Sequence, residues 1–296
     1  FTITKRASQL QMSGIRRMFD LAQKIEDRID LSLGQPHFDV PTETKDAAKN
    51  FIENGSNKYS VSQGLPELRT KILSYLEAKY NYTPKPADDT IITVGATGAL
   101  FCASACLVEE GVDVLIPDPY FPLYPVQVRQ LGGRPIFVDT YETGFKINVD
   151  LLKKYRTPNT RVLIFNNPVN PTGIVYTPRE VKDIVEFCDS SGIFVISDEV
   201  YNEFVFDCKH ETALNCGENV LLVGAFSKTM GMPGWRLGYA VGHKELIDRM
   251  IAIQQFVYVC APTPFQNAIC ESNLLSYGEL IRAEYRKKRD IIYDML

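Results

Sequence analysis

Short, continuously apolar segments alternate with amphipathic segments through the middle of the chain. Thr177 and Pro178 form the start signal of an amphipathic helix at residues 179–190, and residues 97–108 and 244–256 show the same helical periodicity. Seven apolar runs predict β-strands, at residues 90–94, 113–117, 134–138, 161–165, 193–197, 220–226 and 237–242. Strands that are apolar on both faces are typical of a parallel sheet covered by helices on both sides. The pattern therefore predicts an open α/β domain with a mostly parallel sheet.

The two ends of the chain follow another pattern. Residues 14–26 have helical periodicity, and two further helices are predicted before the first strand. Residues 278–296 form one predicted helix without a stop signal. We therefore expect an amino-terminal arm with part of a small domain at 1–40, a large ligand-binding domain at 41–277, and a linking helix at 278–296 that leads into an incomplete small domain.

Composition and charge narrow the classes of function. The 296 residues are 45% hydrophobic and 23% charged, which is typical of a globular protein. A formal net charge of -4 provides no basic field for nucleic acid. No apolar run approaches the ~20 residues that span a bilayer, and the first residues lack the apolar core of a signal peptide. We expect neither a nucleic acid nor a membrane as a partner.

Cysteine and histidine usage argues against metal chemistry. The seven cysteines are scattered without a CxxC pair, which indicates reduced thiols and a cytoplasmic protein. His37, His210 and His243 lie far apart in the sequence, without the close spacing of most zinc sites. A hydrolase with a Ser-His-Asp triad would also need one of them beside a nucleophile. We expect no bound metal.

Unusual residues follow five of the predicted strands, where open α/β sheets bind their ligands. The segment "GATGAL" follows the first strand, and its Gly95, Ala96 and Thr97 could bring backbone N–H groups to an anion at a helix start. Small residues also serve helix packing at such positions. In "DPYFPLYP", after the second strand, Tyr120 or Phe121 could lie flat on a planar ligand, although core packing is the commoner role of such rings.

Two further strand ends carry polar groups. In "NNPVNPTG" the side-chain amide of Asn170 could donate to a ligand oxygen, although Asn and Pro also form plain turns. In "SDEVY" Asp198 directly follows an apolar strand, where a carboxylate is costly unless it is paired, and Tyr201 comes three residues later. The alternative role of Asp198 is that of a cap on the following turn.

A lysine and an arginine follow the sixth predicted strand, in "FSKTMGMPGWRLGY". Lys228 stands beside Ser227, and Arg236 is held between Trp235 and Leu237. A lysine in a loop is usually a solvated charge, but burial or a nearby cation deprotonates the amine and makes it nucleophilic.

Together the five strand ends offer an anion cradle, an aromatic ring, an amide, a carboxylate, a phenol, an amine and an arginine. This set matches a planar, phosphorylated cofactor that bears an aldehyde, namely pyridoxal phosphate. Lys228 would bond to the aldehyde, and Asp198 would keep the pyridine nitrogen protonated. Arg236 and the cradle would neutralise the phosphate.

The chain resembles the class I and II aminotransferases, which are fold-type I pyridoxal phosphate enzymes, over nearly its whole length. The motifs agree in order: "LSLGQPHFD", "YSVSQGLPELR", "VGATGAL", "NNPVNPTG", "SDEVY" and "SKTMGMPGWRLGY". The resemblance implies a fold-type I transferase, with a mostly parallel central sheet flanked by helices and a partial small domain.

The resemblance also implies roles for single residues. Lys228 would hold the cofactor covalently and then act as the base that moves the substrate proton. Asp198 would pair with the pyridine nitrogen. Tyr201 and Asn170 would bind the ring oxygen, and Asn170 would also contact the substrate. Gly34 would belong to the loop that closes on the substrate.

The same resemblance implies a phosphate site and a dimer. The phosphate would bind to Ser227, Arg236 and the backbone at residues 95–97. Phe121 would be the stacking ring, with Tyr120 as the alternative. Tyr59 would reach the phosphate of a neighbouring subunit, which implies a homodimer with shared sites.

One departure from the family pattern leads to three functional expectations. Family members continue beyond the position of Leu296 into a segment with a second arginine for the substrate carboxylate. We expect a pyridoxal phosphate-dependent aminotransferase that exchanges an amino group between an L-amino acid and a 2-oxo acid. The alternatives are a C–S lyase or related β-elimination enzyme, and a cofactor-binding chain that is inactive because that segment is missing.

Overall fold

The fold is built on one sheet of seven strands. The structure is a computed structural model that describes residues 1–8, 10, 14–27, 29, 34–84 and 88–296. The strands are β1 (Asp88–Thr93), β2 (Asp113–Asp118), β3 (Arg134–Asp139), β4 (Thr160–Asn166), β5 (Phe194–Asp198), β6 (Val220–Ala225) and β7 (Gly238–His243). Their order across the sheet is β1-β7-β6-β5-β4-β2-β3, and β7 is antiparallel to both neighbours while the other pairings are parallel. The prediction of a mostly parallel sheet is confirmed.

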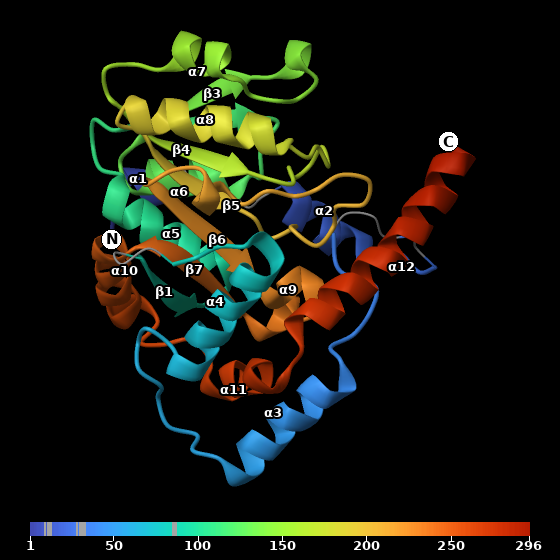
Figure 1. Ribbon diagram of the computed structural model, residues 1–296. Coiled ribbons are helices and arrows are strands. Elements are labelled where there is room, and N and C mark those ends of the chain that lie inside the picture. The colour runs from blue at the N-terminus through green and yellow to red at the C-terminus, as the bar shows by residue number, and fades with distance from the viewer. Residues whose placement is uncertain (9, 11–13, 28, 30–33, 85–87) are drawn as a thin grey trace.

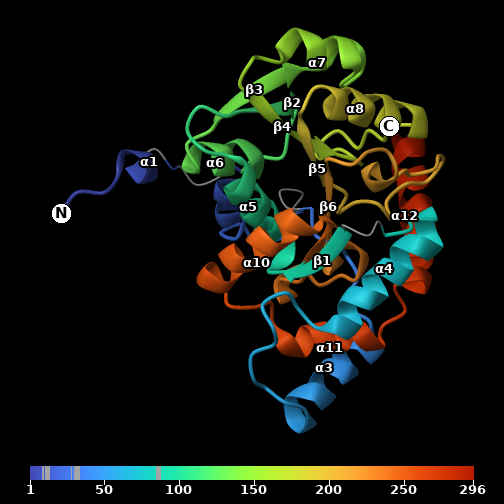
Figure 2. The ribbon, with the colours of Figure 1, turned by 60° about the vertical axis from the view of Figure 1, so that its left-hand side comes forward.

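Helices cover both faces of this sheet (Figures 1 and 2). One layer contains α5 (Gly95–Leu107), α6 (Leu123–Gln130) and α10 (Lys244–Val257), and the other contains α4 (Pro66–Tyr80), α7 (Val149–Tyr155) and α8 (Pro178–Ser190). In β4, Val162 and Ile164 pack into the first layer while Leu163 and Phe165 pack into the second. Because successive strand residues face opposite sides, burial of both faces requires an uninterrupted apolar run.

The predicted helices are present, and two of them have clear start signals. Thr177 and Glu180 form a capping box at the start of α8, as the sequence predicts for Thr177. The last helix, α12 (Leu274–Met295), begins earlier than predicted because the side chain of Asn273 accepts a hydrogen bond from the backbone N–H of Ser276. This helix extends beyond the sheet, and the carboxyl end of the chain lies at its far end (Figure 1).

Shorter elements complete the described chain. The remaining helices are α1 (Lys5–Ser8), α2 (Gly14–Ala22), α3 (Thr42–Asn54), α9 (Phe226–Thr229) and α11 (Thr263–Glu271), with 3-10 turns at Tyr141–Thr143, Ala213–Asn215 and Pro233–Trp235. The helix predicted at residues 14–26 is α2, which ends earlier than predicted, at Ala22. Part of the "LSLGQPHFD" motif, residues 31–33, lies outside the described residues. Among the described helices, none combines the length and apolar character that crossing a membrane requires.

The direction of the strands defines two edges of the sheet. Because β1 to β6 run the same way, their last residues lie together, and we call this side the carboxyl edge. The opposite side, the amino edge, contains the first residues of these strands, such as Asp113 and Arg134, and also His243 at the end of β7. All five strand ends singled out by the sequence lie at the carboxyl edge.

Candidate active site

The start of α5 forms a cradle for an anion together with Arg236. Gly95 has a φ of 67°, a conformation that turns the chain directly from β1 into α5. A Cβ at Gly95 would lie 2.6 Å from the Nη2 atom of Arg236, and one at Gly238 would lie 2.7 Å from the backbone N of Ala96. The guanidinium therefore lies against the first turn of α5, and the residues that follow, Ala96 and Thr97, are accessible. Helix N–H groups and a guanidinium together suit a phosphate.

Asp198 is a buried carboxylate at the end of β5. Its side chain is 3% exposed and accepts hydrogen bonds from the Tyr124 hydroxyl, at 2.8 Å, and the Val200 backbone N–H, at 3.3 Å. Burial raises its pKa to about 6, although both hydrogen bonds act in the opposite direction. No described cation forms an ion pair with this group. The bond from Val200 also confirms the capping role, so Asp198 holds the turn and offers an oxygen to a cationic partner.

Tyr124 is a site residue that sequence analysis missed. It lies at the start of α6, is 3% exposed, and contacts Asp198 from 74 residues away in the chain. Its distance of three residues from Phe121 was the available signal, since a short helical turn brings such residues to one side. The two rings meet edge to face with centroids 5.7 Å apart.

The two candidates for the stacking ring differ in their contacts. Tyr120 stacks on Phe137 of β3 with ring centroids 4.9 Å apart, so one face of its ring is engaged within the fold. Phe121 instead contacts Tyr124, which binds Asp198. This arrangement favours Phe121, as the sequence predicted.

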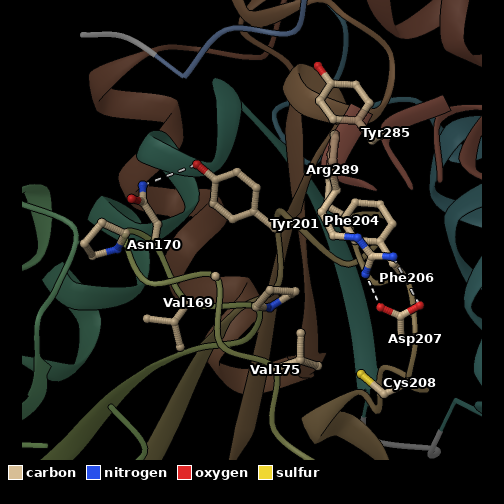
Figure 3. Close-up of a pocket in the computed structure, with 13 residues that line it drawn as sticks. Val169, Asn170, Val175, Tyr201, Phe204, Phe206, Asp207, Cys208, Tyr285 and Arg289 are labelled. Atoms are coloured by element: carbon tan, nitrogen blue, oxygen red, sulfur yellow. Dashed lines mark hydrogen bonds and ion pairs between the residues drawn. The ribbon is translucent and has the colours of Figure 1, made fainter. Parts of the chain in front are cut away.

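Tyr201 and Asn170 lie together at the ends of β5 and β4 (Figure 3). The side-chain amide of Asn170 donates to the Tyr201 hydroxyl at 3.3 Å. Its backbone N–H donates to the side chain of Asn166 at 2.7 Å, and Asn166 in turn donates to the backbone oxygen of Asp198. Burial, with a contribution from Asp198, raises the pKa of Tyr201 to about 12. The phenol therefore keeps its proton and remains a hydrogen-bond donor at neutral pH.

Lys228 lies in α9, directly after β6, and its amine points toward this group. The Nζ atom donates to the backbone oxygen of Gly34 at 2.8 Å and lies 5.9 Å from the centroid of the Tyr201 ring. Burial lowers the pKa of Lys228, and the positive charge of Arg236 adds to the effect. Both factors increase the fraction of neutral, nucleophilic amine. Ser227, beside it, is half-buried.

The structure brings together most of the predicted residues but not Tyr59. Tyr59 lies on the loop between α3 and α4 and is 82% exposed. Within the described chain, no hydrogen bond or ring contact joins it to Lys228, Asp198 or Arg236.

A cavity of about 600 Å³ opens beside Asn170 and Tyr201. Its walls include Val169 and Phe204, and α12 contributes residues that sequence analysis did not single out (Figure 3). One of them, Arg289, is held by Asp207 and lies over the ring of Phe206. This guanidinium is thus already engaged by a carboxylate of the same chain.

These residues fit a planar cofactor with a phosphate at one end and a ring nitrogen at the other. A Cβ at Gly95 would fill the space beside Arg236 in the cradle, and Asp198 is a buried acid without a cationic partner among the described residues. Lys228 supplies an amine whose pKa is lowered by burial and by the positive charge of Arg236. The donor set matches the needs of a phosphate, a protonated ring nitrogen and an aldehyde.

Comparisons with known proteins agree with this site. Residues 26–296 match the sequence model of the family described as aminotransferase class I and II. The chain is 35% identical over 303 residues to an aspartate aminotransferase of Pyrococcus abyssi, covering 99% of this chain and 78% of that protein. It is 34% identical, with the same coverage, to aromatic-amino-acid aminotransferase 2 of Thermococcus litoralis.

Solved structures show the same fold. Aspartate aminotransferase of Thermus thermophilus with maleate superposes with a TM-score of 0.94 at 29% identity, covering 99% of this chain and 80% of that one. A structure titled Pyrococcus protein-A1 superposes with a TM-score of 0.92 at 35% identity, covering 98% and 77% of the two chains.

Proposed function

The chain belongs to the aminotransferase class I and II family, and we propose that it binds pyridoxal phosphate at the carboxyl edge of its sheet. It is an aminotransferase, and members of this family generally depend on that cofactor. The substrates are an L-amino acid and a 2-oxo acid. The observation that supports cofactor binding most strongly is Asp198, a buried carboxylate that forms no ion pair with any described residue.

Each end of the cofactor has its own residues. Ser227, Arg236 and the backbone at residues 95–97 would hold the phosphate, because the helix start and the guanidinium both attract an anion. Phe121, which meets Tyr124 edge to face, would cover a face of the ring. Asp198 would accept a hydrogen bond from the ring nitrogen, and a positive charge there would lower the pKa of this carboxylate, which burial raises to about 6. Tyr124 keeps Asp198 oriented.

The reaction requires a proton to move at the substrate Cα. Pyridoxal phosphate, when bound, supplies a ring that accepts electrons and stabilises negative charge at that carbon. Lys228 would take the proton from Cα and deliver it to the cofactor carbon that carried the aldehyde, since its lowered pKa provides the free amine that a general base needs. Tyr201 and Asn170, which lie together, would donate toward the ring oxygen. The Lys228 amine donates to the backbone oxygen of Gly34, in the amino-terminal segment.

The exposed apolar residues around Tyr59 support a homodimer. Residues 58–62 lie against α10 and the start of α11, since the Gln254 side chain donates to the Ser62 backbone oxygen at 2.6 Å and the Ser60 N–H donates to the Thr263 hydroxyl at 3.2 Å. Tyr59 and Phe256 are 82% and 89% exposed on these adjoining segments. A second copy of the chain covers this surface and receives Tyr59 at its phosphate site. The change Phe256→Asp should therefore convert dimers into monomers in analytical ultracentrifugation.

The proposed domain division follows from the same layout. The seven strands lie within residues 41–277, which form the cofactor domain. Residues 1–40 form the arm with part of the small domain, and residues 278–296 form the linking helix. All seven cysteines are free, which supports a cytoplasmic location.

The first experiment is the visible absorption spectrum of the purified protein with added pyridoxal phosphate. We expect a band that borohydride fixes covalently to Lys228 and that one class of amino acid bleaches in a panel that includes aspartate and tyrosine. A 2-oxo acid should restore the band, since transamination is reversible. Release of ammonia and pyruvate without an oxo acid acceptor would instead identify a lyase, and the absence of any band would contradict the cofactor site.

A further inference from the structure

Glu203 is a buried carboxylate beside the active site that the proposed reaction does not use. It is 1% exposed and contacts two helices that are distant in the sequence. From α4, the Tyr75 hydroxyl donates to its Oε1 atom and Lys79 forms an ion pair with it. From α12, Arg282 donates to its Oε2 atom at 2.7 Å. Glu203 therefore joins α4 and α12 to the turn that follows β5.

The charges in this cluster are retained in spite of burial. Burial raises the pKa of Glu203, but Lys79, Tyr75 and Arg282 outweigh this effect, and the pKa lies below its usual value. Burial lowers the pKa of Lys79 to about 8, against the attraction of Glu203. Because desolvation offsets much of the attraction in a buried ion pair, such a cluster adds little net stability while it fixes geometry.

The backbone of α12 approaches Glu203 closely. A Cβ at Gly278 would lie 2.5 Å from the Cδ atom of Glu203 and within 2.7 Å of both its carboxylate oxygens. Arg282 follows Gly278 by four residues, on the same side of the helix. Gly278 therefore allows α12 to approach the Glu203 carboxylate, and Arg282 forms an ion pair with that carboxylate.

The same turn carries Tyr201 on its other side. The Phe204 N–H donates to the Tyr201 backbone oxygen at 2.8 Å, and the Asn202 N–H donates to that of Glu199 at 3.1 Å. The Asn202 side chain donates to the hydroxyls of Tyr75 and Tyr80, at 3.0 Å each. The turn is thus anchored outward by Asn202 and Glu203, while Tyr201 is directed toward Asn170.

We propose that Glu203 is a positioning residue, whose carboxylate anchors the turn to α4 and α12 and so sets the Tyr201 phenol relative to Asn170 and Lys228. The effect on the cofactor rests on the proposed function, but the anchoring of the turn does not.

The first test measures the turn directly. Amide hydrogen exchange is followed at Asn202 and Phe204 in Glu203→Gln, with and without pyridoxal phosphate. We expect exchange at both amides to become at least about tenfold faster, since local opening costs less without the anchor. The matched control is Asp113→Asn, which removes a second buried carboxylate held by an arginine and a hydroxyl, at the amino edge. Unchanged exchange at Asn202 and Phe204 would overturn the proposal.

The second test asks whether Glu203 acts through Tyr201. A phenol that donates to an anionic ring oxygen favours the deprotonated form of the bound cofactor, so displacement of Tyr201 raises the midpoint of its visible pH titration. We expect Glu203→Gln to raise this midpoint by about half a unit to one unit in the wild-type background, and not in Tyr201→Phe. An equal shift in both backgrounds, or no shift in either, would overturn the proposal.

A second variant allows the proposal to be tested even if Glu203→Gln alone disturbs folding. Glu203→Gln leaves Lys79 buried without its counter-charge, so Glu203→Gln with Lys79→Gln removes both charges together. The double variant should show the same faster exchange and the same raised midpoint. If wild-type protein shows no visible band, the proposed cofactor site fails, while the exchange rates still decide the role of Glu203.

Discussion

The two edges of the sheet hold buried carboxylates in different ways. At the amino edge, Asp113 is 2% exposed and accepts hydrogen bonds from the Arg134 Nε and Nη2 atoms at 2.7 and 2.6 Å. Arg134 keeps the pKa of Asp113 below its usual value. At the carboxyl edge, Asp198 and Glu199 are equally buried, but burial raises their pKa values to about 6 and about 7.

The difference lies in where the counter-charge comes from. Asp113 finds its cation in Arg134, so the pair is complete within the chain. Among the described residues, Asp198 accepts hydrogen bonds only from Tyr124 and Val200, and one oxygen of Glu199 has no hydrogen-bond partner. A carboxylate that is buried without a cation is costly, and such groups mark places where a ligand supplies what the fold does not.

Lysines and arginines show the same contrast. Lys244 follows β7 at the amino edge and pairs with Asp248 at 2.9 Å, whereas Lys228 follows β6 at the carboxyl edge and donates to the backbone oxygen of Gly34. Arg134 pairs with a carboxylate, whereas Arg236 donates only to the backbone oxygen of Pro233 in the described chain. Three matched pairs of variants can therefore test whether the carboxyl edge is functional and the amino edge structural.

The lysine pair has the largest expected effect. Lys228→Ala should lower transamination by at least about 10³-fold, because it removes both the covalent attachment and the general base. Borohydride should then no longer fix the cofactor to the protein. Lys244→Ala is the control and should leave both properties unchanged. Equal transamination activity of Lys228→Ala and Lys244→Ala would contradict the proposed difference between the two edges.

The aspartate pair separates catalysis from stability. Asp198→Asn should lower kcat by about 10²- to 10³-fold, since the ring nitrogen loses its charged partner. Asp113→Asn should leave kcat unchanged and reduce the free energy of unfolding, because the buried Asp113 side chain loses its charged hydrogen bonds to Arg134. Steady-state kinetics and urea unfolding measure the two effects. A large loss of kcat in Asp113→Asn would contradict the assignment of roles.

The pH dependence of stability also distinguishes Asp198 from Asp113. The pKa of Asp198 is raised from 3.8 to about 6, so the cofactor-free folded protein binds an extra proton in this window and loses stability as the pH rises through it. Relative to wild type, cofactor-free Asp198→Asn should gain on the order of 2–3 kcal/mol between pH 4 and pH 7, on the scale of about 1.4 kcal/mol per unit. Asp113 acts in the opposite sense, since its lowered pKa makes stability fall as the pH drops. A constant difference between Asp198→Asn and wild type would show that Asp198 is not perturbed.

The arginine pair has the smallest expected effect. Arg236→Gln should weaken the affinity for pyridoxal phosphate by about tenfold, because Arg236 is accessible and the α5 N–H groups still bind the phosphate. Equilibrium titration of the visible band measures it. Arg134→Gln should leave this affinity unchanged. Equal weakening by both changes would indicate a general loss of structure instead of a lost phosphate contact.

Much of the fold could be predicted because strands and helices leave local patterns. The seven apolar runs correspond to β1–β7, and Thr177 marks the start of α8. The direction of β7 could not be predicted, since an apolar run with both faces buried reads the same in either direction. Lys228, Asp198 and Asn170 could be singled out because each lies at the end of a strand or shortly after it, and strand ends meet at one edge of a parallel sheet.

Other site residues were missed because their partners are distant in the chain. Tyr124 binds Asp198 across 74 residues, and Arg282 binds Glu203 across 79. Neither contact leaves a local signal, since each depends on how a helix packs against the turn after β5. Phe121 and Tyr120 are adjacent in the sequence, and the structure separates these two candidates for the stacking ring by their contacts. Phe121 meets Tyr124, whereas Tyr120 stacks on Phe137.

The sequence by itself determined the order of elements, the chemistry available at each strand end and the resemblance to the family. The tertiary structure decided which of these groups are buried, which have partners and how far their pKa values move. Asp198 and Asp113 show why. Both are aspartates at a terminus of an apolar strand, since Asp113 is the first residue of β2 and Asp198 is the last residue of β5. In the part of the chain that the structure describes, an arginine pairs with Asp113 and none pairs with Asp198. The pKa of a carboxyl group depends on its surroundings in space, which the local sequence does not specify.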